Sequence, residues 1–160
     1  MADATLNSRH RRFIRAILPV VALLASGPVS AHEDAMGITA DRMEVMKDMA
    51  SHMSALGKML DGRAAYDVAT VRDHARALHE KCLEAAGQFP DHAHDHHSRA
   101  AAAVWDQPER FKAQMDNLER AASELVSATA PGQRGSIRPQ FADVGRACAS
   151  CHEAFRLPED

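Results

Sequence analysis

The sequence predicts an all-α protein, an antiparallel four-helix bundle, on three observations. Aromatic residues make up only 4% of the 160 residues, and the chain has only 8 glycines and 7 prolines, which favours helices over sheet. Four segments repeat apolar residues at steps of three and four, as amphipathic helices do. No segment shows the strict apolar–polar alternation of a strand, and the length suits one domain.

The first 31 residues have the features of a secretory signal peptide. A basic region that includes Arg9 and Arg15 precedes the run AILPVVALLASGPV, which is shorter than a membrane span, and small residues lead to a cut after Ala31. Residues 32–160 would then form one mature domain in the periplasm. The net charge of −3 includes the basic leader, so the mature chain is more acidic. This argues against nucleic acid or an anionic membrane as a partner.

The first two helices follow the leader. Thr39 or Asp41 can cap the first helix, and Gly62 marks its end. Its predicted apolar stripe consists of Met46, Met49, Ala50, Met53, Leu56 and Leu60. The second helix begins near Tyr66 and ends by Gly87. Its predicted stripe consists of Val68, Val71, Ala75, Leu78 and Cys82, which makes that cysteine a buried small residue rather than a link between subunits.

A polar, histidine-rich loop separates these helices from the last two. The segment FPDHAHDHHSR has no helical period. Asp106 is expected to cap the third helix, with Pro108 in its first turn. The buried stripe of this helix is predicted to be Phe111, Met115, Leu118, Ala122 and Leu125. The segment APGQRGS interrupts the helical pattern again. The last helix is predicted to begin between Ser136 and Pro139 and to end by Pro158.

The last helix carries GRACASCHEAFR, in which Cys148, Cys151 and His152 form a CxxCH motif. Residues three and four apart share a helical face, so both thiols and the imidazole project together. The sulfurs can form thioethers to the vinyl groups of a haem while the imidazole ligates the iron, which is the c-type attachment pattern. A thioredoxin-like redox pair would follow a strand, and a zinc ion would need a fourth ligand from the histidine loop. The export signal and helical context favour haem c, with zinc as the alternative.

The order of motifs along the chain resembles the cytochrome c′ family. The CxxCH lies near the C-terminus with VG before it and EAFR after it. The likeness extends to DRMEVM in the first helix, YD before the second, FP after it and VW ahead of the third. It covers essentially the whole mature chain. The resemblance implies a periplasmic haem-binding four-helix bundle, often a homodimer, among electron carriers and nitric-oxide-binding proteins.

The resemblance also implies roles on the proximal side of the haem. Cys148 and Cys151 would be the thioether cysteines, and His152 would be the proximal iron ligand. Arg156, one turn further along, resembles the family's basic residue beside that histidine.

On the distal side the resemblance points to the start of the first helix. Arg42 resembles an arginine that faces a haem propionate, and Met43 lies where the family's first helix also touches the haem. Met46 falls at the distal position, where the family divides. High-spin members have an apolar residue there and a five-coordinate iron, whereas in low-spin members a methionine ligates the iron. We expect Met46 to be the distal ligand.

These features predict a periplasmic c-type cytochrome that exchanges electrons with redox partner proteins. One alternative is a five-coordinate haem that binds nitric oxide or another small gas, and another is a zinc-binding or metal-storage protein. No acid, base or nucleophile pair suggests an enzyme. Clustered imidazoles of the loop can bind zinc, copper or nickel, although a solvated polar loop is the plainer interpretation. These histidines are His92, His94, His96 and His97.

Overall fold

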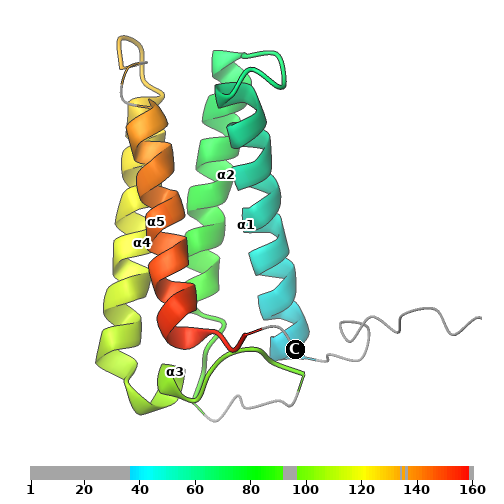
Figure 1. The fold of residues 1–160 in the computed structure, drawn as a ribbon, viewed down its shortest axis with the longest axis vertical. Coiled ribbons are helices and arrows are strands. Elements are labelled where there is room, and N and C mark those ends of the chain that lie inside the picture. The colour runs from blue at the N-terminus through cyan, green and yellow to red at the C-terminus, as the bar shows by residue number, and fades with distance from the viewer. Residues whose placement is uncertain (1–36, 92–96, 134, 136, 159–160) are drawn as a thin grey trace, which may run out of the picture.

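The computed structural model describes residues 37–91, 97–133, 135 and 137–158, and the predicted signal peptide over residues 1–31 lies outside them. The helices are α1 (Ile38–Leu60), α2 (Val68–Ala86), α3 (Ala103–Asp106), α4 (Pro108–Ala128) and α5 (Ile137–Phe155). The four long helices run alternately up and down as a bundle (Figure 1). This confirms the predicted all-α four-helix fold. The single turn of α3 was not predicted, because it lies in the long connection between α2 and α4.

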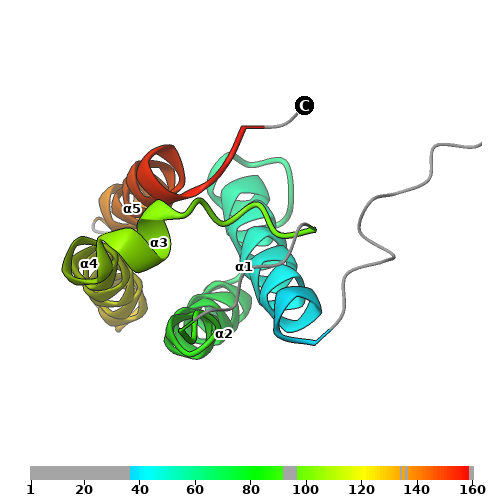
Figure 2. The same ribbon diagram turned by 90° about the horizontal axis from the view of Figure 1, so that it is seen from below.

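The bundle has three tightly packed sides and one more open side. Helix α1 packs on α2, α2 on α4, and α4 on α5. Seen from below, the helices follow one another in this order, with α1 and α5 flanking the open side (Figure 2). These two antiparallel helices approach at one end, where a Cβ on Gly57 would lie 3.5 Å from the Phe141 Cζ atom. Arg138 also donates a hydrogen bond to the Leu60 carbonyl there.

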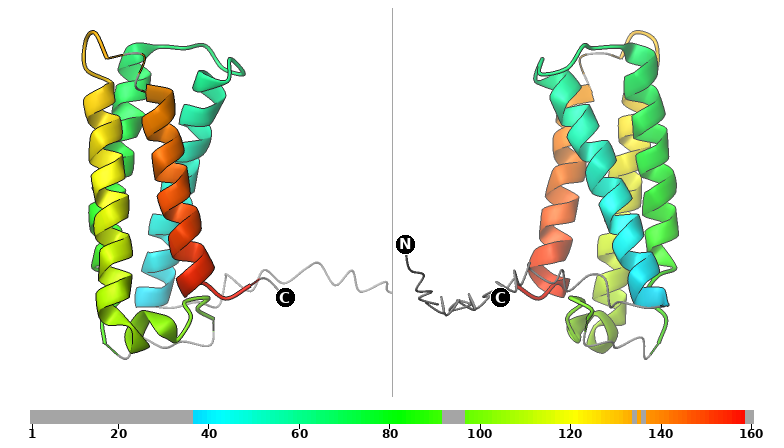
Figure 3. Two further views of the ribbon diagram at one scale, coloured as in Figure 1. Left: turned by 60° about the vertical axis from the view of Figure 1, so that its left-hand side comes forward. Right: turned by 90° about the vertical axis from the view of Figure 1, so that its right-hand side faces the viewer.

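Toward their other ends α1 and α5 spread apart (Figure 3, right). That wider end holds the first turns of α1 and the CxxCH of α5. The fold therefore brings the two sequence motifs that the haem prediction depends on to the same end of the bundle.

The core contains most of the predicted apolar stripes. All five predicted positions of α4 are buried, as are four of the five in α2, and Val68 is 38% exposed. In α1 the buried stripe is rotated toward α2 relative to the prediction. Its buried apolar residues are Val45, Met49, Leu56, Met59 and Leu60. Met46 and Met53 are half-buried and Ala50 is exposed, so the assignment of Ala50 to the core was wrong.

Two predicted helix caps were wrong. Helix α1 begins after Gly37, which has φ of 59° and makes no side-chain cap, while Thr39 is already inside the first turn and buried. Helix α4 begins after Gln107, because Asp106 is used as the last residue of α3. A cap that was not predicted opens α2, where Asp67 accepts a 2.7 Å hydrogen bond from the Thr70 amide.

Candidate haem site

Cys148 and Cys151 lie half-buried on the inner side of α5, against the hydrophobic core. Both are free thiols. Burial raises the pKa of each thiol, and the neighbouring Cys148 contributes further at Cys151. Both are therefore protonated at neutral pH. Reactive redox cysteines have a depressed pKa instead, so this environment does not favour the redox interpretation of the motif.

His152 lies one position beyond Cys151 and is more exposed than either cysteine. Its pKa is lowered from the usual value by partial burial and then by the guanidinium charges of Arg156 and Arg99. The imidazole is therefore neutral at pH 7, which leaves a ring nitrogen lone pair available to a metal. The predicted neighbour Arg156 is thus close enough to His152 to influence its charge.

A short extended segment, residues 98–101, crosses the C-terminal end of α5 (Figure 2). The Ala101 amide donates a 2.9 Å hydrogen bond to the Phe155 carbonyl, and the Leu157 amide donates a 2.8 Å bond to the Arg99 carbonyl. Ala100 and Arg156 form an isolated antiparallel bridge between them. This pairing holds Arg99 next to His152, a placement that the local sequence did not predict.

Arg42 is buried at the wide end of the bundle, with only 6% of its surface exposed. Its Nε atom donates a 3.0 Å hydrogen bond to the Gln88 carbonyl, and Nη1 donates a 2.8 Å bond to Ser98 Oγ. Its guanidinium carbon lies 4.4 Å from the centre of the Phe89 ring and 5.9 Å from that of Trp105. Phe89 and Trp105 belong to the FP and VW motifs, so the residues that carried the resemblance surround this arginine.

Met43 and Met46 are half-buried on the flank of α1 that turns away from α2. The α2 side of α1 is marked by His52, which contacts His74, and by Asp48, which pairs with Lys81. The opposite flank is a stripe at steps of three and four that ends at the α5 contact. Its members are Met46, Ala50, Met53 and Gly57.

Helix α5 has a matching stripe that starts at the same contact. Its members are Phe141, Gly145, Cys148 and His152. Met46 lies eleven residues before Gly57, and His152 lies eleven residues after Phe141. Since the helices are antiparallel and rise 1.5 Å per residue, both residues lie about 16 Å below the Gly57–Phe141 contact. Met46 and His152 are therefore at the same level on two facing stripes, where the helices have spread apart.

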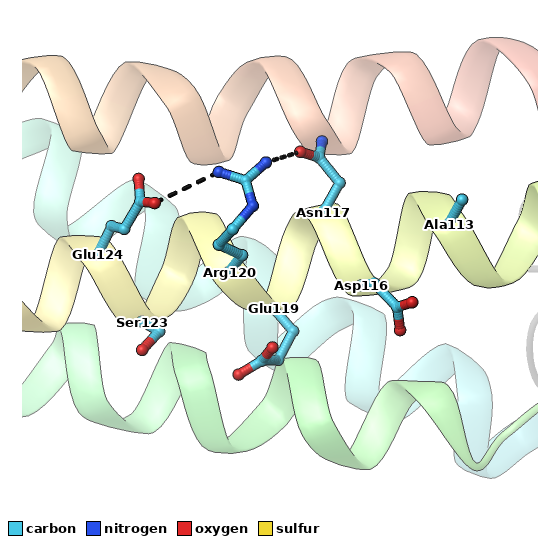
Figure 4. Close-up of a pocket in the computed structure, with 7 residues that line it drawn as sticks. All are labelled: Ala113, Asp116, Asn117, Glu119, Arg120, Ser123 and Glu124. Atoms are coloured by element: carbon cyan, nitrogen blue, oxygen red, sulfur yellow. Dashed lines mark hydrogen bonds and ion pairs between the residues drawn. The ribbon is translucent and has the colours of Figure 1, made fainter.

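The outer face of α4 has a polar hollow that is separate from this site (Figure 4). Arg120 lies at its centre, between Asn117 and Glu124 (Figure 4). No residue of the CxxCH or of the start of α1 lines the hollow. Its residues form a solvated helix face held by pairs one turn apart.

The part of the chain that the structure describes has no group of three or more His, Cys, Asp or Glu side chains placed to hold a metal ion. Within the histidine loop, only His97 belongs to this part of the chain, and His92, His94 and His96 lie outside it. Nor does any described helix have the length and apolar character needed to cross a membrane.

The fold and the placement of the CxxCH on its last helix are those of a c-type haem protein. The family model for cytochrome c′ matches residues 38–156, and the chain belongs to this family. Cytochrome c′ of Rhodospirillum rubrum is 28% identical over 141 residues, which cover 88% of this chain and 95% of the relative. Cytochrome c-554 of Cereibacter sphaeroides is 30% identical over 121 residues, with 72% and 89% covered.

Solved structures show the same fold. Cytochrome c prime from Shewanella frigidimarina aligns with a TM-score of 0.72 at 21% identity, covering 76% of this chain and 94% of that one. A ferrous variant of cytochrome c prime from Alcaligenes xylosoxidans with bound NO aligns with a TM-score of 0.72 at 23% identity, covering 80% and 97%.

Members of this family carry a covalently attached haem c as their cofactor. The chain's own residues fit such a group. The inner side of α5 offers two protonated thiols, the more exposed His152 beside them offers a neutral imidazole, and the facing stripe of α1 offers a half-buried methionine. Beside Arg42, the Thr39 hydroxyl is buried without a hydrogen-bond partner in the described structure, which suits a site that receives a polar ligand group.

Proposed function

We propose that this protein is a periplasmic cytochrome that transfers electrons between redox partner proteins. In this proposal Cys148 and Cys151 form the thioether bonds, His152 is the proximal iron ligand and Met46 is the distal one. The observation that carries it is the register of α1 against α5, which sets Met46 level with His152 across the open side of the bundle.

The chemistry of the two ligands supports a role in electron transfer. When bound, the haem supplies an iron that changes its oxidation state by one electron. A thioether ligand favours the reduced iron and raises its potential relative to a site without it, and two fixed ligands leave little reorganisation on electron transfer.

The surrounding arginines act through their charge. Arg42 offers a fixed guanidinium, anchored by Gln88 and Ser98, to which a haem propionate carboxylate can bind. Partial burial, and after it the charges of Arg156 and Arg99, lower the pKa of the proximal imidazole and so favour iron over a proton at its ring nitrogen. Met43, half-buried next to Arg42, is proposed as an apolar haem contact.

Absorption spectra of the haem-loaded protein test this assignment. We expect a c-type haem whose reduced form has the sharp bands of a low-spin iron. A five-coordinate, high-spin ferrous spectrum would contradict Met46 as an iron ligand. Protein exported without haem would contradict the whole proposal.

Export is a separate part of the proposal, supported by the signal-like residues 1–31. N-terminal sequencing of the haem-containing protein from a periplasmic fraction should begin at His32. A haem-containing chain that keeps its first residues in a membrane fraction would contradict cleavage after Ala31.

A gas-binding function is the second candidate. The observation that favours it is the likeness in fold to the NO-bound Alcaligenes xylosoxidans protein. In this case Met46 would crowd the iron without ligating it. The reduced protein would then be high-spin, would change its spectrum on addition of nitric oxide, and would keep its spin state in a Met46→Ala variant.

A further inference from the structure

A pair of histidines on the opposite flank of α1 has no part in the haem site. His52 of α1 and His74 of α2 are both half-buried, and their Nδ1 atoms lie 2.9 Å apart. The ring centres are 5.2 Å apart with the planes tilted by 57°, so the rings meet through their nitrogens rather than by stacking. Two ring nitrogens from two helices thus lie within 2.9 Å of each other.

The distance between these nitrogens suits a shared metal ion. Two nitrogens that are each about 2.1 Å from a common ion lie about 3 Å apart in the right-angled geometry of copper(II), and about 3.4 Å apart in a tetrahedral zinc site. The observed 2.9 Å separation therefore fits copper(II) as it stands, and a zinc ion would move the two nitrogens about 0.5 Å further apart. A hydrogen bond with one Nδ1–H as donor gives the same distance, although its hydrogen lies near the line between the nitrogens whereas a shared ion lies off that line.

One carboxylate lies close to the pair but is engaged elsewhere. Asp48 lies one turn before His52 and pairs with Lys81 at 3.2 Å, which places a carboxylate near the pair without making it a third ligand.

We propose that His52 and His74 form a two-histidine site for a divalent ion of the zinc or copper type, joining α1 to α2. Imidazole pairs prefer zinc, copper and nickel over calcium and magnesium, which bind oxygen. The described residues offer no group of three protein ligands, so water completes the coordination. Partial exposure of both rings lets the ion enter from solvent. The bound ion would stiffen the α1–α2 contact six residues beyond Met46.

Zinc titration of the haem-loaded protein at pH 7.5 tests the site, with thermal unfolding followed by circular dichroism. Zinc chloride should raise the midpoint temperature of thermal unfolding of the wild-type protein, because a ligand that binds only the folded state stabilises that state. His52→Ala and His74→Ala should each weaken the apparent zinc affinity about tenfold or more, because one of two ligands is lost. An unchanged zinc response in both variants would overturn the proposal.

Two control variants separate this site from the other histidines. His79→Ala removes an imidazole from the same helix that pairs instead with Glu119 of α4, and it should keep the zinc response. A variant with His92, His94, His96 and His97 all changed to alanine should keep it too. If that loop variant alone loses the response, the ion binds the loop and the proposal is wrong.

A spectroscopic measurement covers the case in which an alanine variant unfolds. Copper(II) added to the wild-type protein should give an electron paramagnetic resonance signal with coupling to two imidazole nitrogens. His52→Gln and His74→Gln, which keep a polar side chain, should each give a signal with coupling to only one imidazole nitrogen. A wild-type signal identical to that of both variants would exclude the pair as ligands.

Discussion

Replacement of Met46 is the sharpest test of the distal site. Met46→Leu keeps the volume of the side chain and removes the thioether sulfur, so we expect the packing contribution to the stability loss to stay below about 1.5 kcal/mol. The iron, however, should lose its sixth ligand. The reduced protein should change from a low-spin to a high-spin, five-coordinate spectrum.

The size of the effect on gas binding follows from competition for the sixth position. If Met46 occupies the iron in nine molecules out of ten or more, only a tenth or less of the protein is open to carbon monoxide. The apparent affinity is reduced by that fraction, so its removal should raise carbon monoxide affinity about tenfold or more. Titration of the reduced protein with carbon monoxide, followed by absorption, measures this.

Met53→Leu is the matched control. Met53 is also half-buried and lies on the same stripe of α1, two turns from Met46 toward the Gly57 contact. Seven residues of helix separate the two methionines by about 10 Å along the axis. That is several times the length of a metal–ligand bond, so Met53→Leu should leave the spectrum and the carbon monoxide affinity unchanged. If the two variants behave alike, or if Met53→Leu alone changes the spectrum, the register argument is refuted.

Three further predictions concern attachment, the lone cysteine and the core. Cys148→Ala and Cys151→Ala should each leave one thioether bond, and the double variant should release its haem on a denaturing gel stained for haem. Retention of stained haem by the double variant would contradict the attachment assignment. Cys82 is buried, and burial raises its pKa to about 12, so iodoacetamide should label it only after unfolding. Labelling of the native protein at Cys82 would show that α2 opens. Leu78→Ala removes a fully buried side chain and should cost about 2–5 kcal/mol in urea unfolding, whereas Leu83→Ala, at a site 54% exposed, should cost far less.

The helices were predictable because their signals are local. The stripes of α2 and α4 needed only the spacing of apolar residues in continuous segments. The error at Ala50 has a physical reason. Sequence spacing gives the period of a helix, whereas the partner helix decides which side of an apolar stripe becomes buried, and α2 draws the core toward Val45 and Met59.

The surroundings of Arg42 could not be predicted in the same way. A charged residue near the start of a helix is usually solvated, yet this one is held by Gln88 and Ser98, which lie 46 and 56 residues away. The buried charge is tolerated because the guanidinium donates hydrogen bonds to both residues and also lies over the aromatic ring of Phe89. Such a set depends on the path of the long connection, which has no helical period to reveal it.

The pairing of Met46 with His152 lies between these two cases. Each stripe can be found from the sequence, since both step by three and four over eleven residues. What the sequence does not contain is the point at which the two helices meet. The contact at Gly57 supplies it, because a residue without a side chain lets α5 approach through Phe141. Counting down both helices from that point places Met46 and His152 at the same level, and this helix geometry supports the proposed distal role of Met46 separately from the likeness to other proteins.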